Sequence, residues 1–384
     1  MSVPRIAAAK PPWKGLWRPG KWVPDTPVYV LNIWGNQKIN KENQTGNLRN
    51  NRSDWSFDMP TPSPAGIKYI TAEDAVATIN NGNRVFIGSG CGEPQKLINT
   101  LVESTASDIT IFQMLPHTIA SFLNNRVFLE RFLVKLFFVP VQLQQAAYKG
   151  RIDYIPTYLS QIPQLFRNNQ IVIDTVLIQI SPPDEFGNAS LGISVDVTLE
   201  AVRNARKVIA QVNPKMPRTH GDGFIHISEI DYLVYHEEEL LFMDHDQFDK
   251  NISRRVAQYV KELVDDGSTL QVGYGQFPYA LLQYFDDKND LGIHTHMISD
   301  AFVPLIKNGN ITNRHKNFMR GRAVATFCMG SRIVYDYIDN NIQFFFGSAD
   351  WVNTPAIIGR NDNFISISSA LEIDLTGQVC SDAV

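Results

Sequence analysis

Two histidines separated by a single residue, His294 and His296, are the side chains in this sequence best placed for chemistry. They lie in the mostly apolar run 291–300, which predicts a strand. Alternate residues of a strand point to the same side, so both imidazoles are expected on one face. A neutral imidazole can act as a base, a nucleophile or a metal ligand. No cysteine or third histidine lies at ligand spacing nearby, so we expect no metal, with a two-histidine metal site as the lesser alternative.

Two carboxylates are candidates for a general base or an orienting group beside His296. Asp300 is the last residue of the same run, and Glu93 lies in a glycine-rich segment far away in the sequence. For each of these two carboxylates, a purely structural role is the alternative to a role beside His296. The other histidines between residues 220 and 245 are scattered, and we interpret them as surface or polar-network residues.

Two glycine-rich segments, 85–97 and 270–281, share one pattern. Each predicts a strand, a Gly-x-Gly turn, a proline and a helix. Glycine lets a backbone approach a ligand closely, and proline is well suited to the first position of a helix, so each turn aims a helix N-terminus at a possible ligand. Two such turns in related halves predict a cleft, although one Gly-rich turn alone is common in any α/β protein.

From residue 69 onward, short β-branched runs alternate with helix-like segments, which predicts parallel sheets covered by helices. Strands are predicted at 84–87, 175–180 and 269–274. In the segment 251–267, apolar residues recur at helical spacing, with Asn251 as the expected N-cap and Gly267 as the stop.

The length of 384 residues fits two domains and an additional segment. Residues 1–66 contain five of the six tryptophans among prolines and asparagines without periodicity, which predicts an irregular extension; a partner-binding or membrane-interface arm is the alternative reading. The proline-rich run 60–64 is its expected linker. We place the first domain at 67–245 and the second at 246–384.

The composition excludes several functional classes. A net charge of −4 gives no basic excess for a nucleic-acid surface. Three scattered cysteines favour neither a disulfide framework nor a zinc site. No apolar run reaches the length of a membrane span, and the N-terminus lacks the apolar core of a signal peptide. We therefore expect a cytoplasmic protein that binds neither nucleic acid nor membranes.

Five segments together resemble the acetyl-CoA hydrolase / 4-hydroxybutyrate CoA-transferase family. They occur in family order, and they are 180–188, 190–196, 211–219, 291–300 and 369–379. The resemblance implies the CoA-transferase fold, α/β with two tandem open domains. It also implies transfer of CoA between a short-chain acyl-CoA and a carboxylate such as acetate, or acetyl-CoA hydrolysis. Coenzyme A is then a substrate, no cofactor is tightly bound, and a homo-oligomer is expected.

The resemblance also implies a set of site residues. His296 occupies the position of the family's nucleophilic glutamate. Ser368 stands where the family commonly has asparagine, and Gly377 opens a CoA-contacting loop that continues in relatives past the position of Val384. Backbone N–H groups that would hold CoA or an oxyanion are expected at Gln271, Val272, Gly273, Tyr274, Gly275 and Gln276.

The histidine at position 296 changes the expected chemistry. Imidazole cannot form the acyl anhydride that a glutamate forms, but it can attack a thioester to give an acyl-imidazole that water hydrolyses. A histidine at this position therefore favours hydrolysis of the thioester over transfer of CoA. Two alternatives remain open: a thioesterase that uses His296 as nucleophile or base, and a non-enzymatic relative that binds CoA or stabilises an oligomer without turnover.

Overall fold

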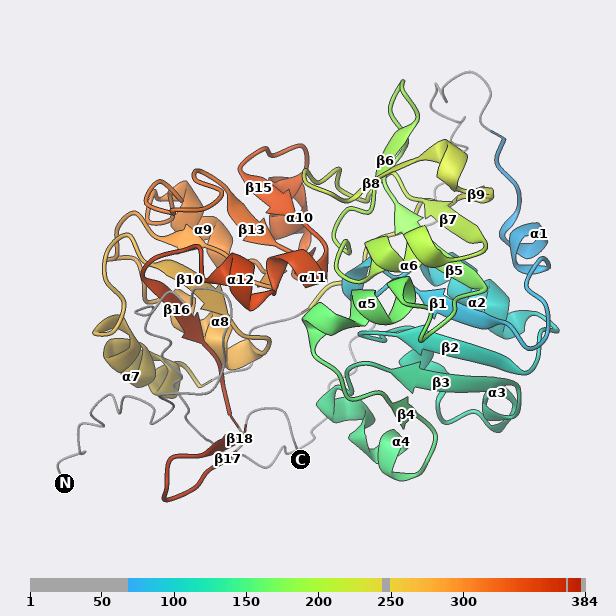
Figure 1. Ribbon diagram of the computed structural model, residues 1–384, viewed down its shortest axis with the longest axis horizontal. Coiled ribbons are helices and arrows are strands. Elements are labelled where there is room, and N and C mark those ends of the chain that lie inside the picture. Colours follow the sequence, from blue (N-terminus) through green and yellow to red (C-terminus); the bar gives the residue numbers. More distant parts are fainter. Residues whose placement is uncertain (1–67, 244–248, 371, 381–384) are drawn as a thin grey trace, which may run out of the picture.

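The computed structural model describes residues 68–243, 249–370 and 372–380, and it forms two α/β lobes that lie side by side (Figure 1). All strands of the first lobe precede residue 236, and those of the second follow residue 268. The predicted extension 1–66, its linker and the predicted domain boundary at 245/246 lie outside the described residues. The two-domain α/β class expected from the sequence is confirmed.

The first lobe is built on a seven-stranded sheet with the order β4-β3-β2-β1-β5-β7-β9. Every neighbouring pair is parallel. The strands are β1 (Arg84–Ile87), β2 (Ile109–Gln113), β3 (Phe132–Leu136), β4 (Asp153–Tyr154), β5 (Thr175–Ile180), β7 (Val208–Val212) and β9 (Tyr232–Tyr235). The strand order reverses at β1, which has β2 on one side and β5 on the other, so a ligand crevice is expected beyond the carboxyl end of β1.

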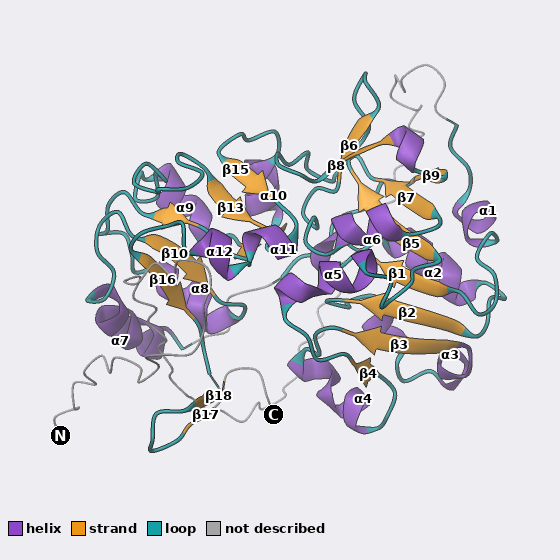
Figure 2. Cartoon of the chain, viewed as in Figure 1, coloured by secondary structure: helices purple, strands orange, loops and turns teal. Residues whose placement is uncertain are grey.

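Helices cover both faces of this sheet (Figure 2). Because successive strand residues point to opposite faces, Val85 and Ile87 pack with one set of helices while Phe86 packs with the other, at 5.6 Å from the ring of Phe166. The first set is α1 (Ala72–Val76), α2 (Gln95–Glu103) and α3 (Arg126–Arg131), and the second is α5 (Ile162–Arg167) and α6 (Thr198–Asn204). Also in this lobe are α4 (Gln144–Tyr148) and the antiparallel pair β6 (Asn188–Ser190) and β8 (Phe224–His226).

The second lobe has a smaller parallel sheet, β11-β10-β16, formed by β10 (Thr269–Val272), β11 (Gly292–Ile293) and β16 (Phe364–Ile367). Three further pairs are β12 (Met297–Ile298) with β14 (Phe327–Cys328), β13 (Ala323–Ala325) with β15 (Phe344–Phe346), and the hairpin β17 (Glu372–Ile373) with β18 (Val379–Cys380). Its helices are α7 (Lys250–Lys261), α8 (Gln276–Leu282), α9 (Phe302–Lys307), α10 (Arg332–Ile338), α11 (Ala349–Val352) and α12 (Pro355–Ile358).

The structure confirms the strands predicted at 84–87 and 175–180, but it shortens the one predicted at 269–274, which ends at Val272. The helix predicted from residue 251 begins at Lys250, and its N-cap is Asp249 instead of Asn251. The Asp249 carboxylate accepts the N–H groups of Asn251 at 2.8 Å and Ile252 at 3.3 Å, which places Asn251 inside the first turn.

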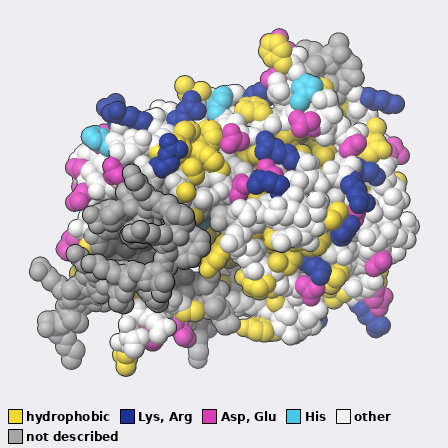
Figure 3. All heavy atoms as spheres, viewed as in Figure 1, with side chains coloured by type: hydrophobic (Ala, Val, Ile, Leu, Met, Phe, Trp, Pro, Cys, Tyr) yellow, Lys and Arg dark blue, Asp and Glu magenta, His cyan; other side chains and the backbone are white. Residues whose placement is uncertain are grey.

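The two lobes are tied together by backbone and charged contacts. The N–H of Asp196 donates to the carbonyl of Thr326 at 2.9 Å, and Arg167 pairs with Asp350 at 2.9 Å. Acidic and basic side chains are interspersed over the face seen in Figure 3. Among the described residues, no helix has both the length and the apolar character needed to cross a membrane.

Candidate active site

Both Gly-rich turns follow the strand at which the order of a sheet reverses. Segment 88–92 leads from β1 to α2, and segment 273–275 leads from β10 to α8. The predicted sequence of strand, turn and helix is therefore confirmed twice. The prolines are not at the first helical position, however, because Pro94 is the N-cap of α2 and Pro278 is the third residue of α8.

The second turn requires glycine because Ser368 lies directly against it. A Cβ atom built on Gly273 would lie 2.8 Å from the Ser368 Oγ, and the Gly273 N–H donates to the carbonyl of Ile367 at 2.7 Å. The parallel pairing of β10 with β16 produces this contact, since it places the residues after both strands at the same edge.

His296 lies at that same edge, three residues beyond the end of β11. Its Nδ1 is 3.5 Å from the amide nitrogen of Gln271, a side chain of β10. The Ser366 hydroxyl donates in turn to the Gln271 Oε1 at 3.3 Å. Burial lowers the pKa of His296 to about 4, so its imidazole is neutral at physiological pH.

His294 and His296 lie on the same face of the β11-β10-β16 sheet, as expected, because His294 packs against Phe364 and His296 contacts Gln271, and both partners are on that face; only His296 lines the cavity described below. Residues 294–296 lie between β11 and β12, and the strand pairing continues through a parallel bridge between His294 and Val324. The Nε2 of His294 donates to the carbonyl of Val352 at 2.8 Å, and its Nδ1 is 3.5 Å from the amide nitrogen of Asn361. Both ring nitrogens of His294 are thus engaged by protein atoms.

Glu93 and Asp300 take structural roles. The buried Glu93 carboxylate accepts the N–H groups of His117 at 2.6 Å and Thr118 at 2.7 Å. Burial raises the pKa of Glu93 to about 7, and these hydrogen bonds oppose the shift. Asp300 accepts the N–H of Ser331 at 2.7 Å in front of α10. Neither carboxylate has a contact with His296 among the described interactions.

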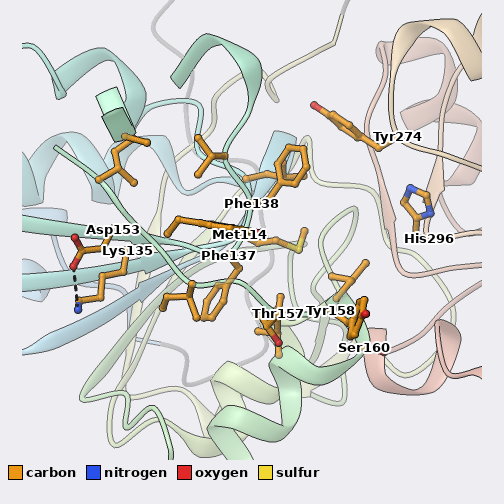
Figure 4. Close-up of a pocket in the computed structure, with 18 of the residues that line it drawn as sticks. Met114, Lys135, Phe137, Phe138, Asp153, Thr157, Tyr158, Ser160, Tyr274 and His296 are labelled. Atoms are coloured by element: carbon orange, nitrogen blue, oxygen red, sulfur yellow. Dashed lines mark ion pairs between the residues drawn. The ribbon is translucent and has the colours of Figure 1, made fainter. Parts of the chain in front are cut away.

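A cavity of about 1050 Å³ lies between the carboxyl edges of the two sheets (Figure 4). One wall comes from residues that directly follow β2, β3 and β4, namely Met114, Leu115, Phe137, Phe138 and Ile155. The facing wall includes Gln271, Tyr274 and His296. Phe138 and Tyr274 meet edge to face across the two lobes, with ring centroids 5.4 Å apart.

The predicted site residues thus fall into three groups. Gln271, Tyr274 and His296 line the cavity together. Next to them at the same sheet edge, but outside the cavity lining, lie Val272, Gly273, Gly275 and Ser368. Gly377 lies apart, in the exposed turn of the β17–β18 hairpin, and the side chain of Gln276 lies outside the described part of the structure.

Reasoning from the sequence missed two contributors. Ser366 belongs to β16, and Ser368 directly follows this strand. The two serines are two residues apart, so strand alternation could have placed Ser366 on the same face as Ser368. Phe138 follows β3, and the rule that parallel sheets bind ligands at their carboxyl edge could have singled it out. In the described part of the chain, no three His, Cys, Asp or Glu side chains are grouped to hold a metal ion.

Comparison with known proteins identifies the family. The acetyl-CoA hydrolase/transferase N-terminal domain matches residues 63–243, and the C-terminal domain of the same name matches residues 330–384. The 4-hydroxybutyrate coenzyme A transferase of Clostridium kluyveri is 39% identical over 320 residues, which are 83% of this chain and 74% of that protein.

Two further relatives agree. The succinyl-CoA:acetate/propanoyl-CoA:succinate CoA transferase of Fasciola hepatica is 37% identical over 81% of this chain and 66% of its own length. The crystal structure of RipA from Yersinia pestis superimposes with a TM-score of 0.78 at 33% identity, covering 83% of this chain and 74% of RipA. The chain therefore belongs to the acetyl-CoA hydrolase/transferase family.

Proposed function

We propose that the protein binds an acyl-CoA thioester in the cavity between its two lobes and presents the thioester carbonyl to His296. The observation that carries this proposal is the position of His296, the imidazole that lines the cavity where the carboxyl edges of both sheets face each other. Two of the relatives named above are CoA transferases, one for 4-hydroxybutyrate and one for succinyl-CoA with acetate and propanoyl-CoA with succinate. Coenzyme A is a substrate in this proposal, and the protein acts in the cytoplasm as a homo-oligomer.

The chemistry that we infer for His296 is hydrolysis. A ring nitrogen with a free electron pair attacks the thioester carbonyl, the new C–N bond forms, and the C–S bond breaks. The proton of the other ring nitrogen passes to the departing CoA thiolate, so CoA leaves as the thiol and a neutral acyl-imidazole remains. Water then attacks the acyl-imidazole, which yields the carboxylic acid and restores the neutral imidazole. A pKa of about 4 leaves only about one imidazole in a thousand protonated at pH 7, and attack by Nε2 further requires that the Gln271 amide oxygen accepts a hydrogen bond from Nδ1–H.

Backbone N–H groups at the second Gly-rich turn are the proposed partners of the developing oxyanion. The N–H of Val272 already donates to the Thr295 hydroxyl at 3.3 Å, and that of Gly273 donates to Ile367. Tyr274 and Gly275 come next and lead into α8, so their backbone N–H groups are the proposed donors to the oxyanion.

A second candidate function is binding of CoA compounds without turnover. Its support is that Glu93 and Asp300 are both engaged elsewhere, so the described residues supply no carboxylate in hydrogen-bond contact with His296. A weakly basic imidazole without such a partner is a poor general base.

One experiment separates these candidates. The purified protein, its His296→Glu variant and a His296→Gln control are incubated with acetyl-CoA and butyrate, and butyryl-CoA and free thiol are followed together. We expect thiol release from the unmodified protein, loss of that release in His296→Gln, and butyryl-CoA formation in His296→Glu at least about 100-fold above the unmodified protein. Transfer by the unmodified protein would contradict the proposed role of His296. Thiol release equal to that of His296→Gln would favour the binding role.

A further inference from the structure

The cavity extends well beyond His296 into the first lobe. In Figure 4 it runs from His296 and Tyr274 on one side, past Met114, Phe137 and Phe138, to Lys135 and Asp153 on the other. Its volume of about 1050 Å³ is slightly above the roughly 300–1,000 Å³ typical of small-molecule sites. An acetyl group of two carbons would leave most of this space unfilled, even beside the end of a pantetheine arm.

The walls of the cavity are mainly aliphatic and aromatic. Phe137 and Met114 are buried, and Ile152 and Ile155 line the same region from the first lobe. Removing hydrocarbon from water against such walls is favourable at about 0.8 kcal/mol for each methylene, whereas an unpaired polar group would lose its water without compensation. The cavity therefore suits a hydrocarbon body.

The charges of the cavity argue against a second carboxylate on the ligand. Lys135 is the one lysine or arginine among the described lining residues, and its Nζ pairs with Asp153 at 3.2 Å. His296 is neutral, because burial holds its pKa near 4. A dicarboxylic acyl group, such as succinyl, would bring its free carboxylate into a region with no unpaired cation among these residues.

We infer that the acyl group handled at this site is an uncharged hydrocarbon chain or ring larger than acetyl, from a medium-chain or cyclic monocarboxylic acid. The inference deepens the proposed function and rests on it. The edge-to-face pair of Phe138 and Tyr274 contributes rings from both lobes beside His296, so the contact between the lobes completes the wall next to the reacting carbonyl.

The test uses thioether analogues of acyl-CoA, which cannot be turned over. Isothermal titration of the full chain compares free CoA, S-ethyl-CoA, S-butyl-CoA, S-hexyl-CoA and S-(3-carboxypropyl)-CoA. About 0.8 kcal/mol per methylene corresponds to about fourfold in affinity, so S-hexyl-CoA is expected to bind at least about tenfold more tightly than S-ethyl-CoA. S-(3-carboxypropyl)-CoA is expected to bind more weakly than S-butyl-CoA.

Equal affinities for all the thioether analogues would overturn the inference, because the apolar part of the cavity would then hold pantetheine instead of the acyl group. Tighter binding of S-(3-carboxypropyl)-CoA than of S-butyl-CoA would also overturn it, because the cavity would then accept a charged acyl group. If free CoA binds in that case, the proposed function still stands. If neither CoA nor any thioether binds, the proposed function and the inference both fail.

A matched pair of substitutions tests whether the preference for longer alkyl chains arises in this cavity. Ala147 of α4 lines the cavity, and its neighbour Ala146 is equally half-buried but is not among the lining residues. Ala147→Phe is expected to reduce the preference for S-hexyl-CoA over S-ethyl-CoA to less than about threefold, while Ala146→Phe keeps it. If Ala147→Phe does not fold, Ala147→Leu replaces it; leucine fills less space, so an intermediate preference for S-hexyl-CoA is expected. An unchanged preference in a folded Ala147 variant would contradict the assignment.

Discussion

A buried lysine supports the strand that leads into the candidate site, and its titration gives a quantitative test of the structure. Lys316 is only 3% exposed, and its Nζ donates to the carbonyls of Ile293 and Arg322, both at 2.7 Å. Ile293 is the residue before His294. No ion pair with a carboxylate is formed by Lys316 among the described residues, and burial lowers its pKa to about 7. We predict that Lys316→Met changes how the stability of the protein depends on pH.

The sign follows from the proton counts of the two states. In the unfolded chain this lysine titrates near 10.5, and in the folded protein near 7, so between these pH values the unfolded state holds more protons. Folding stability therefore rises with pH across this window, by at most about 1.36 kcal/mol per pH unit. Between pH 7 and pH 9 the contribution of Lys316 amounts to about 2 kcal/mol, and Met at this position removes it.

The assay is urea unfolding at pH 7, 8 and 9 for the unmodified protein, Lys316→Met and the exposed control Lys149→Met. Loss of the two hydrogen bonds costs Lys316→Met about 1–3 kcal/mol at every pH. On top of this offset, the unmodified protein should gain about 2 kcal/mol relative to Lys316→Met from pH 7 to pH 9. A difference that stays constant within about 0.5 kcal/mol would refute the reasoning, because it would mean that Lys316 titrates alike in both states.

Two further predictions concern neighbouring groups. Burial lowers the pKa of His294 to about 4, so the folding stability falls as the pH drops below the ordinary imidazole value of 6.5. In urea unfolding, His294→Gln should lose about 2 kcal/mol less stability between pH 7 and pH 5 than the unmodified protein. Equal losses in the two proteins would contradict this prediction. Asp300→Ala removes the acceptor of the Ser331 and Val334 N–H groups, at the N-cap and in the first turn of α10. The substitution should cost about 1–3 kcal/mol at pH 7, and a loss below about 0.5 kcal/mol would show that water replaces the carboxylate.

The sequence was most informative where a local signal was repeated along the chain. The runs at 84–87 and 175–180 became strands with those bounds, because β-branched residues buried on both faces leave little alternative. Cap chemistry was less certain. Asp249 and Asn251 are both good N-caps, and only the actual contacts select Asp249.

The arrangement of the site depends on contacts that no local pattern contains. Met114 and His296 are 182 positions apart in the sequence, yet they line one cavity because both follow strands whose carboxyl edges face each other. His294 and His296 share a face, as strand alternation predicts, but their different partners could not be predicted: the His294 ring is engaged by Val352 and Asn361, which lie 58 and 67 positions further along the chain. Strand ends are set by pairing partners, and those partners are distant in sequence.

The consequence of histidine at position 296 depends on the side-chain amide of Gln271. As placed, the Gln271 nitrogen donates to the His296 Nδ1 and its oxygen accepts from the Ser366 hydroxyl, so the imidazole proton is on Nε2 and this nitrogen is a donor. With the amide reversed, the oxygen accepts from Nδ1–H, and Nε2 has the free electron pair that attack on a thioester requires. Because a hydroxyl can either donate or accept, Ser366 satisfies both orientations, and the reversal costs no hydrogen bond. The orientation of one amide thus distinguishes a site that only binds a thioester from one that attacks it.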